Sequence, residues 1–133
     1  MVDIGKLNIP AFQVAYGTTE KYLKHNPNTV YAFLKAIAEA VVLSRKEASV
    51  AKKAIGKYAK IEDAAMVDGT YEAFAPYWAR SLAVRPEAVR AQFDYLDEKE
   101  FPNARNADPR EFFDNSFVNA LEKSGFLQRI GMK

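Results

Sequence analysis

The sequence predicts a mainly α-helical domain with one short strand near its N-terminus. Apolar residues recur at three- and four-residue steps along most of the chain, and prolines and capping residues separate these stretches. Alternation typical of a strand is confined to Phe12, Val14 and Tyr16. A length of 133 residues suits one domain, residues 1 to 133, and 49% hydrophobic residues suffice for a core and exclude a disordered chain.

The N-terminal elements are a strand and two helices. The strand covers residues 9 to 16, begins near Pro10 and needs a partner strand, because a single strand is not stable alone. Thr18 or Thr19 can cap a short helix that runs to Lys24. Asn26 and Pro27 then open a long helix. Its apolar stripe consists of Val30, Phe33, Leu34, Ile37, Val41 and Val42.

Two further helices occupy the middle of the chain. The first covers residues 44 to 58 and has a thinner apolar stripe, with Gly56 a weak point near its end. The second starts near Glu62 and Asp63, whose carboxylates suit the positive end of a helix dipole, and Pro76 kinks or ends it. Its stripe consists of Ala65, Met66, Gly69, Thr70, Ala73, Phe74 and Tyr77.

The C-terminal third contains two more helices and a polar loop. Pro86 opens a helix whose stripe is Val89, Phe93 and Leu96, and residues 99 to 107 form the loop. Asp108 to Glu111 has the spacing of a capping box, with Pro109 at the first helical position. Asn115 or Ser116 can cap a final helix that Gly125 ends, after which Phe126 can fold back on Leu121 or on the turn of Glu122.

The residue types exclude the common catalytic and metal sites. The sequence has no cysteine and a single histidine, His25, so a triad, a multi-histidine site or a cysteine nucleophile is not available within one chain. Paired carboxylates occur at Glu62 and Asp63 and again between Asp97 and Glu100, but in polar stretches beside lysines, where burial is not expected. We therefore predict no enzyme, no catalytic residue, no metal site and no cofactor.

The charge pattern gives no global attraction to nucleic acid. The net charge is +2, although one stretch contains Arg45, Lys46, Lys52, Lys53, Lys57 and Lys60 with Glu47 as the only acid. A surface helix needs a solvated face, so we do not expect a nucleic-acid partner. No run approaches the ~20 apolar residues of a membrane span, so we expect no membrane insertion, and residues 1 to 6 lack the features of a secretory signal peptide.

A group of aromatic residues can serve either as core or as a pocket lining. Phe74 is better explained as core, but Pro76 breaks the helix and exposes one side of Tyr77 and Trp78. These two side chains are therefore candidate ligand contacts.

Three segments carry a resemblance to a known family. They are Ile9-Pro10-Ala11-Phe12-Gln13, Lys24-His25-Asn26-Pro27-Asn28-Thr29-Val30 and Asp108-Pro109-Arg110-Glu111-Phe112-Phe113-Asp114-Asn115-Ser116-Phe117-Val118. With these segments, residues 7 to 128 resemble the C-terminal lobe of ABC-transporter substrate-binding proteins of the type 2 periplasmic class, in the branch that takes nitrate, sulfonates, taurine or thiamine precursors. The resemblance rests on helix caps and aromatic spacing.

The resemblance implies a module that binds a small anionic or heteroaromatic solute and performs no chemistry. It implies ligand contacts at Phe12, Gln13 and Tyr16, an extracytoplasmic location, and an ABC permease partner only within a full-length protein. A lobe that lacks its sheet would expose apolar stripes, so we expect a homodimer or higher assembly, with a shared pocket lined by Phe12, Tyr16 and Trp78. The alternatives are a helical self-association domain without a ligand and, last, an enzyme whose site forms between chains.

Overall fold

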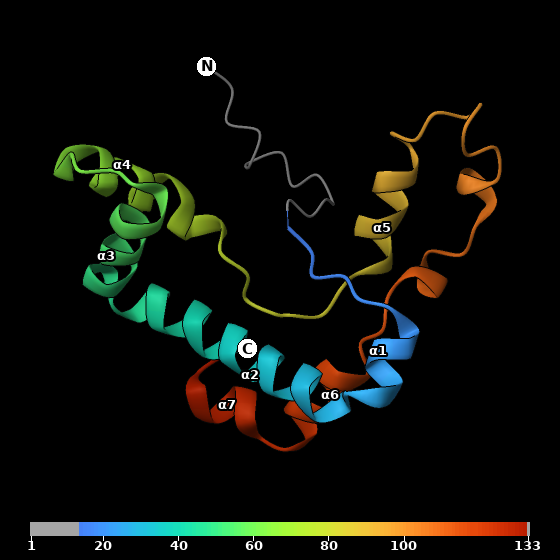
Figure 1. The fold of residues 1–133 in the computed structure, drawn as a ribbon, viewed down its shortest axis with the longest axis horizontal. Helices are drawn as coiled ribbons and strands as arrows, with labels where there is room; N and C mark the ends of the chain where they lie inside the picture. The colour runs from blue at the N-terminus through green and yellow to red at the C-terminus, as the bar shows by residue number, and fades with distance from the viewer. Residues whose placement is uncertain (1–13, 133) are drawn as a thin grey trace.

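A computed structural model describes residues 14 to 132, and the regular structure in this range is helical (Figure 1). The prediction of a mainly α-helical chain is confirmed. The α-helices are α1 (Glu20–His25), α2 (Pro27–Lys46), α3 (Ala48–Ala59), α4 (Ala64–Phe74), α5 (Pro86–Phe93), α6 (Ser116–Lys123) and α7 (Phe126–Ile130). Short 3₁₀ helices are η2 (Ala75–Tyr77), η3 (Ala104–Asn106) and η4 (Pro109–Phe112).

The helices form an open arch around α2 (Figure 1). Helices α6 and α7 pack along one side of α2, and α3 and α4 form a hairpin at its C-terminal end. Helix α5 packs with η3 and η4 at the other end of the molecule. An extended segment, residues 79 to 85, connects the two ends of the arch. Helix α2 contacts α1, α3, α6 and α7 and is therefore the central element of the arch.

Side-chain caps start several of these helices as the sequence predicts. The Thr19 hydroxyl accepts a hydrogen bond from the Tyr22 N–H at 3.2 Å, which selects Thr19 over Thr18 as the cap of α1. Asp63 caps α4 by accepting from the Met66 N–H at 3.0 Å. Pro27 opens α2, but Asn26 does not cap it, because its amide donates back to the Tyr22 carbonyl at 3.3 Å.

The core of the described chain lies where α2 meets α6 and α7. Leu121 is fully buried and is the largest such side chain there. The predicted approach of Phe126 to Leu121 is confirmed, because both belong to this core. Its buried residues are Ala38, Val42, Leu121, Phe126, Leu127 and Met132. This cluster joins residues that lie some eighty positions apart and holds the C-terminus on α2.

The C-terminal segment departs from the prediction in one respect. Gly125 has a φ of 70°, in the left-handed region, and stops α6 as expected. The chain then continues into α7, a helix that the sequence reasoning missed because five residues are too few to show a period. At the end of α2, the Lys46 ammonium donates a hydrogen bond to the Ile130 carbonyl at 2.9 Å, which holds α7 against α2.

The predicted strand over residues 9 to 16 is not confirmed. Residues 14 to 16 have no regular structure, and residues 9 to 13 lie outside the described range. No strand occurs in residues 14 to 132 that could pair with this segment. Instead, the Tyr16 ring packs edge-on against Phe33 of α2, with 5.0 Å between ring centroids. A likeness to the lobe of a binding protein is likewise not confirmed.

Other boundaries are corrected in detail. Helix α5 ends at Phe93, so Leu96 falls in the following turn. Asp108 does accept from a backbone N–H, that of Arg110 at 2.9 Å, but it opens the 3₁₀ helix η4 rather than an α-helix. In residues 14 to 132, no helix is long and apolar enough to cross a membrane.

Asn115 is one of two predicted caps of α6, but its side chain bonds to the segment before α5 instead. Its amide oxygen accepts from the Val84 N–H at 3.0 Å and its amide nitrogen donates to the Val84 carbonyl at 2.9 Å. The Ser116 N–H at the start of α6 donates to Asp114 instead, at 2.7 Å. Asn115 therefore fastens the connecting segment to the start of α6.

Replacement of Leu121 by Ala should reduce the free energy of unfolding by about 3 kcal/mol, because it leaves a cavity in the core. Urea unfolding followed by circular dichroism measures the change. Leu96→Ala is the matched control at an exposed position and should cost less than about 1 kcal/mol. Equal losses in the two variants would show that Leu121 is not a core residue.

Replacement of Asn115 by Asp should cost about 1–2 kcal/mol, since the carboxylate keeps the acceptor for Val84 but loses the donor. Asn115→Ala removes both hydrogen bonds and should cost more. The same unfolding assay applies, with Asn119→Ala at an exposed position of α6 as the control. An Asp variant as stable as the parent would contradict this role.

Candidate functional site

Of the predicted ligand contacts, the three that the structure describes, Tyr16, Tyr77 and Trp78, line neither of the two hollows reported below. Phe12 and Gln13 lie outside the described residues. Tyr16 precedes α1 and packs on α2, whereas Tyr77 ends η2 after α4. Trp78 follows it, and its ring meets the edge of Tyr71 with 5.5 Å between centroids. Solute binding through these residues remains a prediction.

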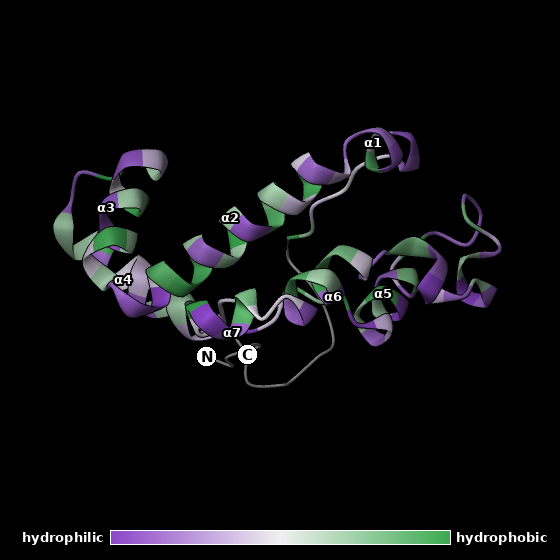
Figure 2. Cartoon of the chain, turned by 90° about the horizontal axis from the view of Figure 1, so that it is seen from below, coloured by the Kyte–Doolittle hydropathy of each residue, from purple (hydrophilic) through white to green (hydrophobic). Residues whose placement is uncertain are grey.

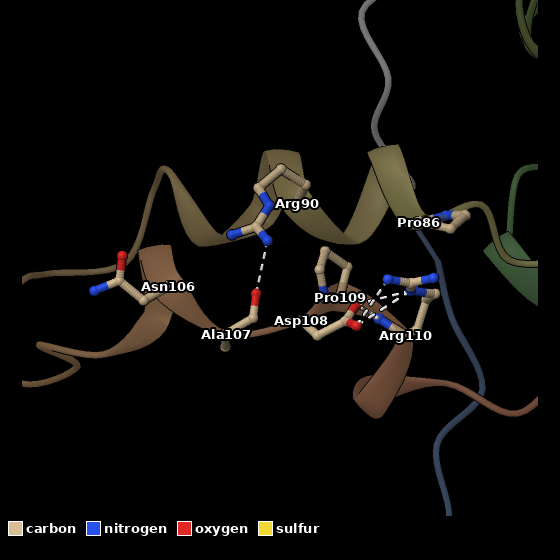
Figure 3. A pocket seen from close by; sticks show the side chains of 7 residues that line it. All are labelled: Pro86, Arg90, Asn106, Ala107, Asp108, Pro109 and Arg110. Atoms are coloured by element: carbon tan, nitrogen blue, oxygen red, sulfur yellow. Dashed lines mark hydrogen bonds and ion pairs between the residues drawn. The ribbon is translucent and has the colours of Figure 1, made fainter.

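The clearest hollow lies elsewhere, between α5 and η4 (Figure 3). It has a volume of about 530 Å³ and is wide open to solvent. Its lining residues are Pro86, Arg90, Asn106, Ala107, Asp108, Pro109 and Arg110. A second open hollow of about 380 Å³ shares Pro86, Arg90 and Pro109 with it. Pockets that hold small ligands enclose most of the ligand surface, which such open hollows do not do.

The charged groups of this hollow are occupied by the chain itself. The Arg90 guanidinium donates to the Arg105 and Ala107 carbonyls, both at 2.6 Å, and Figure 3 shows the bond to Ala107. Arg110 forms an ion pair with Asp108, with 3.0 Å between Nη2 and Oδ2. Arg90 thus ties the loop that precedes η4 to α5. The arrangement stabilises a loop and offers little to a solute.

The pair in this hollow shifts the acid–base behaviour of both partners. Hydrogen bonds from the Arg110 side chain and backbone hold the pKa of Asp108 below its ordinary value, and the same side-chain bond raises the pKa of Arg110. The shift favours the charged carboxylate in the folded state. The contribution of this ion pair to stability is present above the unfolded pKa of Asp108 and is lost as the pH falls through the lowered folded pKa of Asp108.

A further feature of the described surface is apolar and lies on α2. Phe33, Ala36, Ala40 and Leu43 follow each other at steps of three, four and three residues, the spacing of a coiled-coil seam. All four are exposed, and Phe33 and Leu43 are each 43% accessible. Ala38 and Val42, on the opposite face, are buried against α6 and α7. We name these four residues the α2 stripe.

The α2 stripe lies on the face of α2 that α6 and α7 leave uncovered. Figure 2 shows hydrophobic positions along the whole length of α2, with α6 and α7 on one side only. The stripe predicted from the sequence combines Phe33 with Leu34, Val41 and Val42. In the structure Phe33 is exposed, whereas the other three lie on the face that meets α6 and α7. The alanines at 36 and 40, which carry little hydrophobic signal, concealed the second face.

The α3–α4 hairpin has little interior of its own. Ala51 is the only buried residue of the two helices, whereas Val50, Tyr58, Met66 and Phe74 are exposed. Lys52 pairs with Asp68 across the hairpin at 2.9 Å, and a hydrogen bond to that carboxylate raises the pKa of Lys52. Helices of this length are marginal without tertiary contacts. The hairpin therefore presents two helices whose outer faces are unpartnered within the described chain.

Gly56 explains how closely the two helices of this hairpin approach. A Cβ at this position would lie 3.3 Å from the Ile61 carbonyl oxygen and 3.6 Å from Val67. The residue that the sequence suggests as a weak point of α3 is therefore a packing position.

The total surface confirms that the arch is open. The chain exposes 10361 Å², compared with about 7,000 Å² for a compact monomer of 14.9 kDa. Even if the residues outside the described range contributed the full area of an extended chain, about 2,200 Å², an excess of about 1,000 Å² would remain. The described residues thus expose more surface than a compact domain does.

Comparison of the chain with protein-family models, with curated proteins and with solved structures found no match. The resemblance to substrate-binding proteins therefore remains a prediction from the three segments quoted above.

Replacement of Arg110 by Gln should raise the pKa of Asp108 toward the ordinary value, because the charged hydrogen-bond donor is lost. A carbon-detected NMR titration of the Asp108 carboxyl measures this. Arg129→Gln removes the same charge from α7 and should leave the Asp108 titration unchanged. An Asp108 titration that is identical in the Arg110 variant and the parent would contradict the assignment.

Proposed function

We propose that this protein is a helical self-association module, in which the α2 stripe packs against the same stripe of a second copy. The observation that supports it is the exposed row of Phe33, Ala36, Ala40 and Leu43, opposite a face already buried by α6 and α7. Exposed apolar rows of this kind mark interaction surfaces. No chemistry is required of such a module.

The composition of the α2 stripe suits an antiparallel pair of helices. In a two-fold dimer, Phe33 of one copy lies near Leu43 of the other, and the small residues Ala36 and Ala40 lie at the centre. Small side chains at the centre let the helix axes approach, and the larger ones at each end fill the space beside them. The same surface patch then serves both copies.

The exposed area is sufficient for a stable dimer. A standard interface buries about 800 Å² on each partner, and the arch exposes at least that much beyond a compact monomer. A second copy seated on α2 would also shield the α3–α4 hairpin, whose outer residues have few contacts within the described chain. Self-association thus supplies the apolar contacts that the arch lacks.

Solute binding ranks below self-association on these observations. It would need a pocket that encloses the solute, and the hollows of about 530 and 380 Å³ are open and have their arginine already bonded to the chain. A pocket between two copies that includes Tyr77 and Trp78 would first require a dimer, which the measurement below tests.

Replacement of Phe33 or Leu43 by Asp should raise the dissociation constant of the dimer at least about tenfold, because each places a charge in an apolar interface. Sedimentation velocity over a concentration series measures the constant, and circular dichroism verifies that the helices are retained.

The control for added charge is Gln128→Asp, at an exposed position of α7 away from the α2 stripe. It should leave the dissociation constant within about twofold of the parent. A parent protein that sediments as a monomer at every concentration would contradict the proposed function. A dimer weakened equally by all three variants would show that the α2 stripe is not the interface.

A further inference from the structure

Exposed lysines and exposed apolar residues lie together in the sequence of α3 and its C-terminal cap. Lys53 and Lys57 are exposed four residues apart on α3, and Lys60 is the exposed residue that ends it. Val50 and Tyr58 of the same helix are also exposed. The Lys57 ammonium lies 5.1 Å from the centre of the Tyr58 ring, which is 78% exposed. Lys52 is not part of this surface, because Asp68 already pairs with it. We name these five residues the basic patch.

A second surface of the same design but opposite charge follows α5. Residues 94 to 100 contain four carboxylates and one lysine, and Tyr95 among them is 80% exposed. Leu96 and Phe101 are also exposed. Within this turn, Asp97 accepts from the Lys99 N–H at 2.8 Å and Glu98 pairs with Arg105 at 2.7 Å. We name Asp94, Tyr95, Leu96, Glu100 and Phe101 the acidic patch.

The two patches cannot meet within one chain. Helix α3 lies at one end of the long axis of the arch, and the segment after α5 lies at the other end (Figure 1). Opposite charges beside exposed apolar residues nevertheless make the patches complementary to each other. A chain that has the basic patch at one end and the acidic patch at the other can pair both patches with those of a second copy.

We propose that the basic patch of one copy docks on the acidic patch of a second copy, and the reverse, in an antiparallel two-fold homodimer. This inference rests on the proposed function and adds to it the orientation of the two chains. An antiparallel pairing of α2 places the α3 end of one arch beside the α5 end of the other. Two-fold symmetry then forms the contact twice.

A polyanion is the competing occupant of the basic patch, and the acidic patch distinguishes the two cases. A strand of nucleic acid would engage the lysines alone, because the carboxylates of residues 94 to 100 repel phosphates. A second copy uses both patches, including their apolar centres. The match of charge within one chain, whose net charge is only +2, therefore favours the second copy.

Charge reversal with complementation tests the orientation. One variant carries Lys53→Glu with Lys57→Glu, and the other carries Asp94→Lys with Glu100→Lys. Each alone should raise the dissociation constant of its dimer at least about tenfold, because like charges meet at both contacts. An equal mixture of the two should form a heterodimer within about threefold of the parent affinity, since both contacts are again of opposite charge.

Matched controls reverse equal charges elsewhere on the surface. Lys21→Glu with Lys123→Glu, and Glu111→Lys with Glu122→Lys, change the net charge by the same amount at exposed positions outside the patches. These variants should dimerise like the parent, and their mixture should show no preference for the heterodimer. Sedimentation velocity and native mass spectrometry report homodimer and heterodimer separately.

The outcomes separate this inference from the proposed function. A parent dimer that none of the patch variants weakens would overturn the proposed orientation and leave the α2 interface standing. A monomeric parent would overturn both. Binding of a single-stranded oligonucleotide that is lost with Lys53→Glu and Lys57→Glu, with no heterodimer in the mixture, would assign the basic patch to a polyanion. Recovery of dimer only in the mixture of the two patch variants supports the inference.

Discussion

The packing of α2 against α6 and α7 around Leu121 is the interaction on which the rest of the arch depends. Both ends of the arch are attached to this contact: α3 continues from the C-terminal end of α2, and Asn115 fastens the connecting segment to the start of α6. The α3–α4 hairpin at one end contributes one buried residue, Ala51, and α5 at the other contributes Ala88, Val89 and Phe93. Loss of this contact would leave short helices with no common core.

The use of α2 on two faces explains the surface of the molecule. One face is covered within the chain, and the other presents the α2 stripe in the same helix. A helix that is apolar on two faces is normally buried between neighbours. In the described chain the second neighbour is missing, and a second copy would occupy its place. In the proposed dimer, the charged patches at the ends of the arch would set the direction of that copy.

Most helices could be predicted from the sequence because their signals are local. Pro27, Pro86, Asp63 and Thr19 mark helix starts through backbone and capping chemistry that acts within one turn. Asn115 could not be placed in this way, since its partner Val84 lies 31 residues away. The predicted strand is not confirmed over residues 14 to 16, the part of it that the structure describes, and a strand depends on a partner that no local pattern reveals. The α2 stripe was missed because the alanines that form half of it have no distinctive hydrophobic signal.

The open arch has a consequence for how the protein folds. Because the arch leaves many large apolar side chains exposed, the proposed dimer would add stability that the separate chain lacks, and folding and association would then be linked. The melting temperature would rise with the total protein concentration.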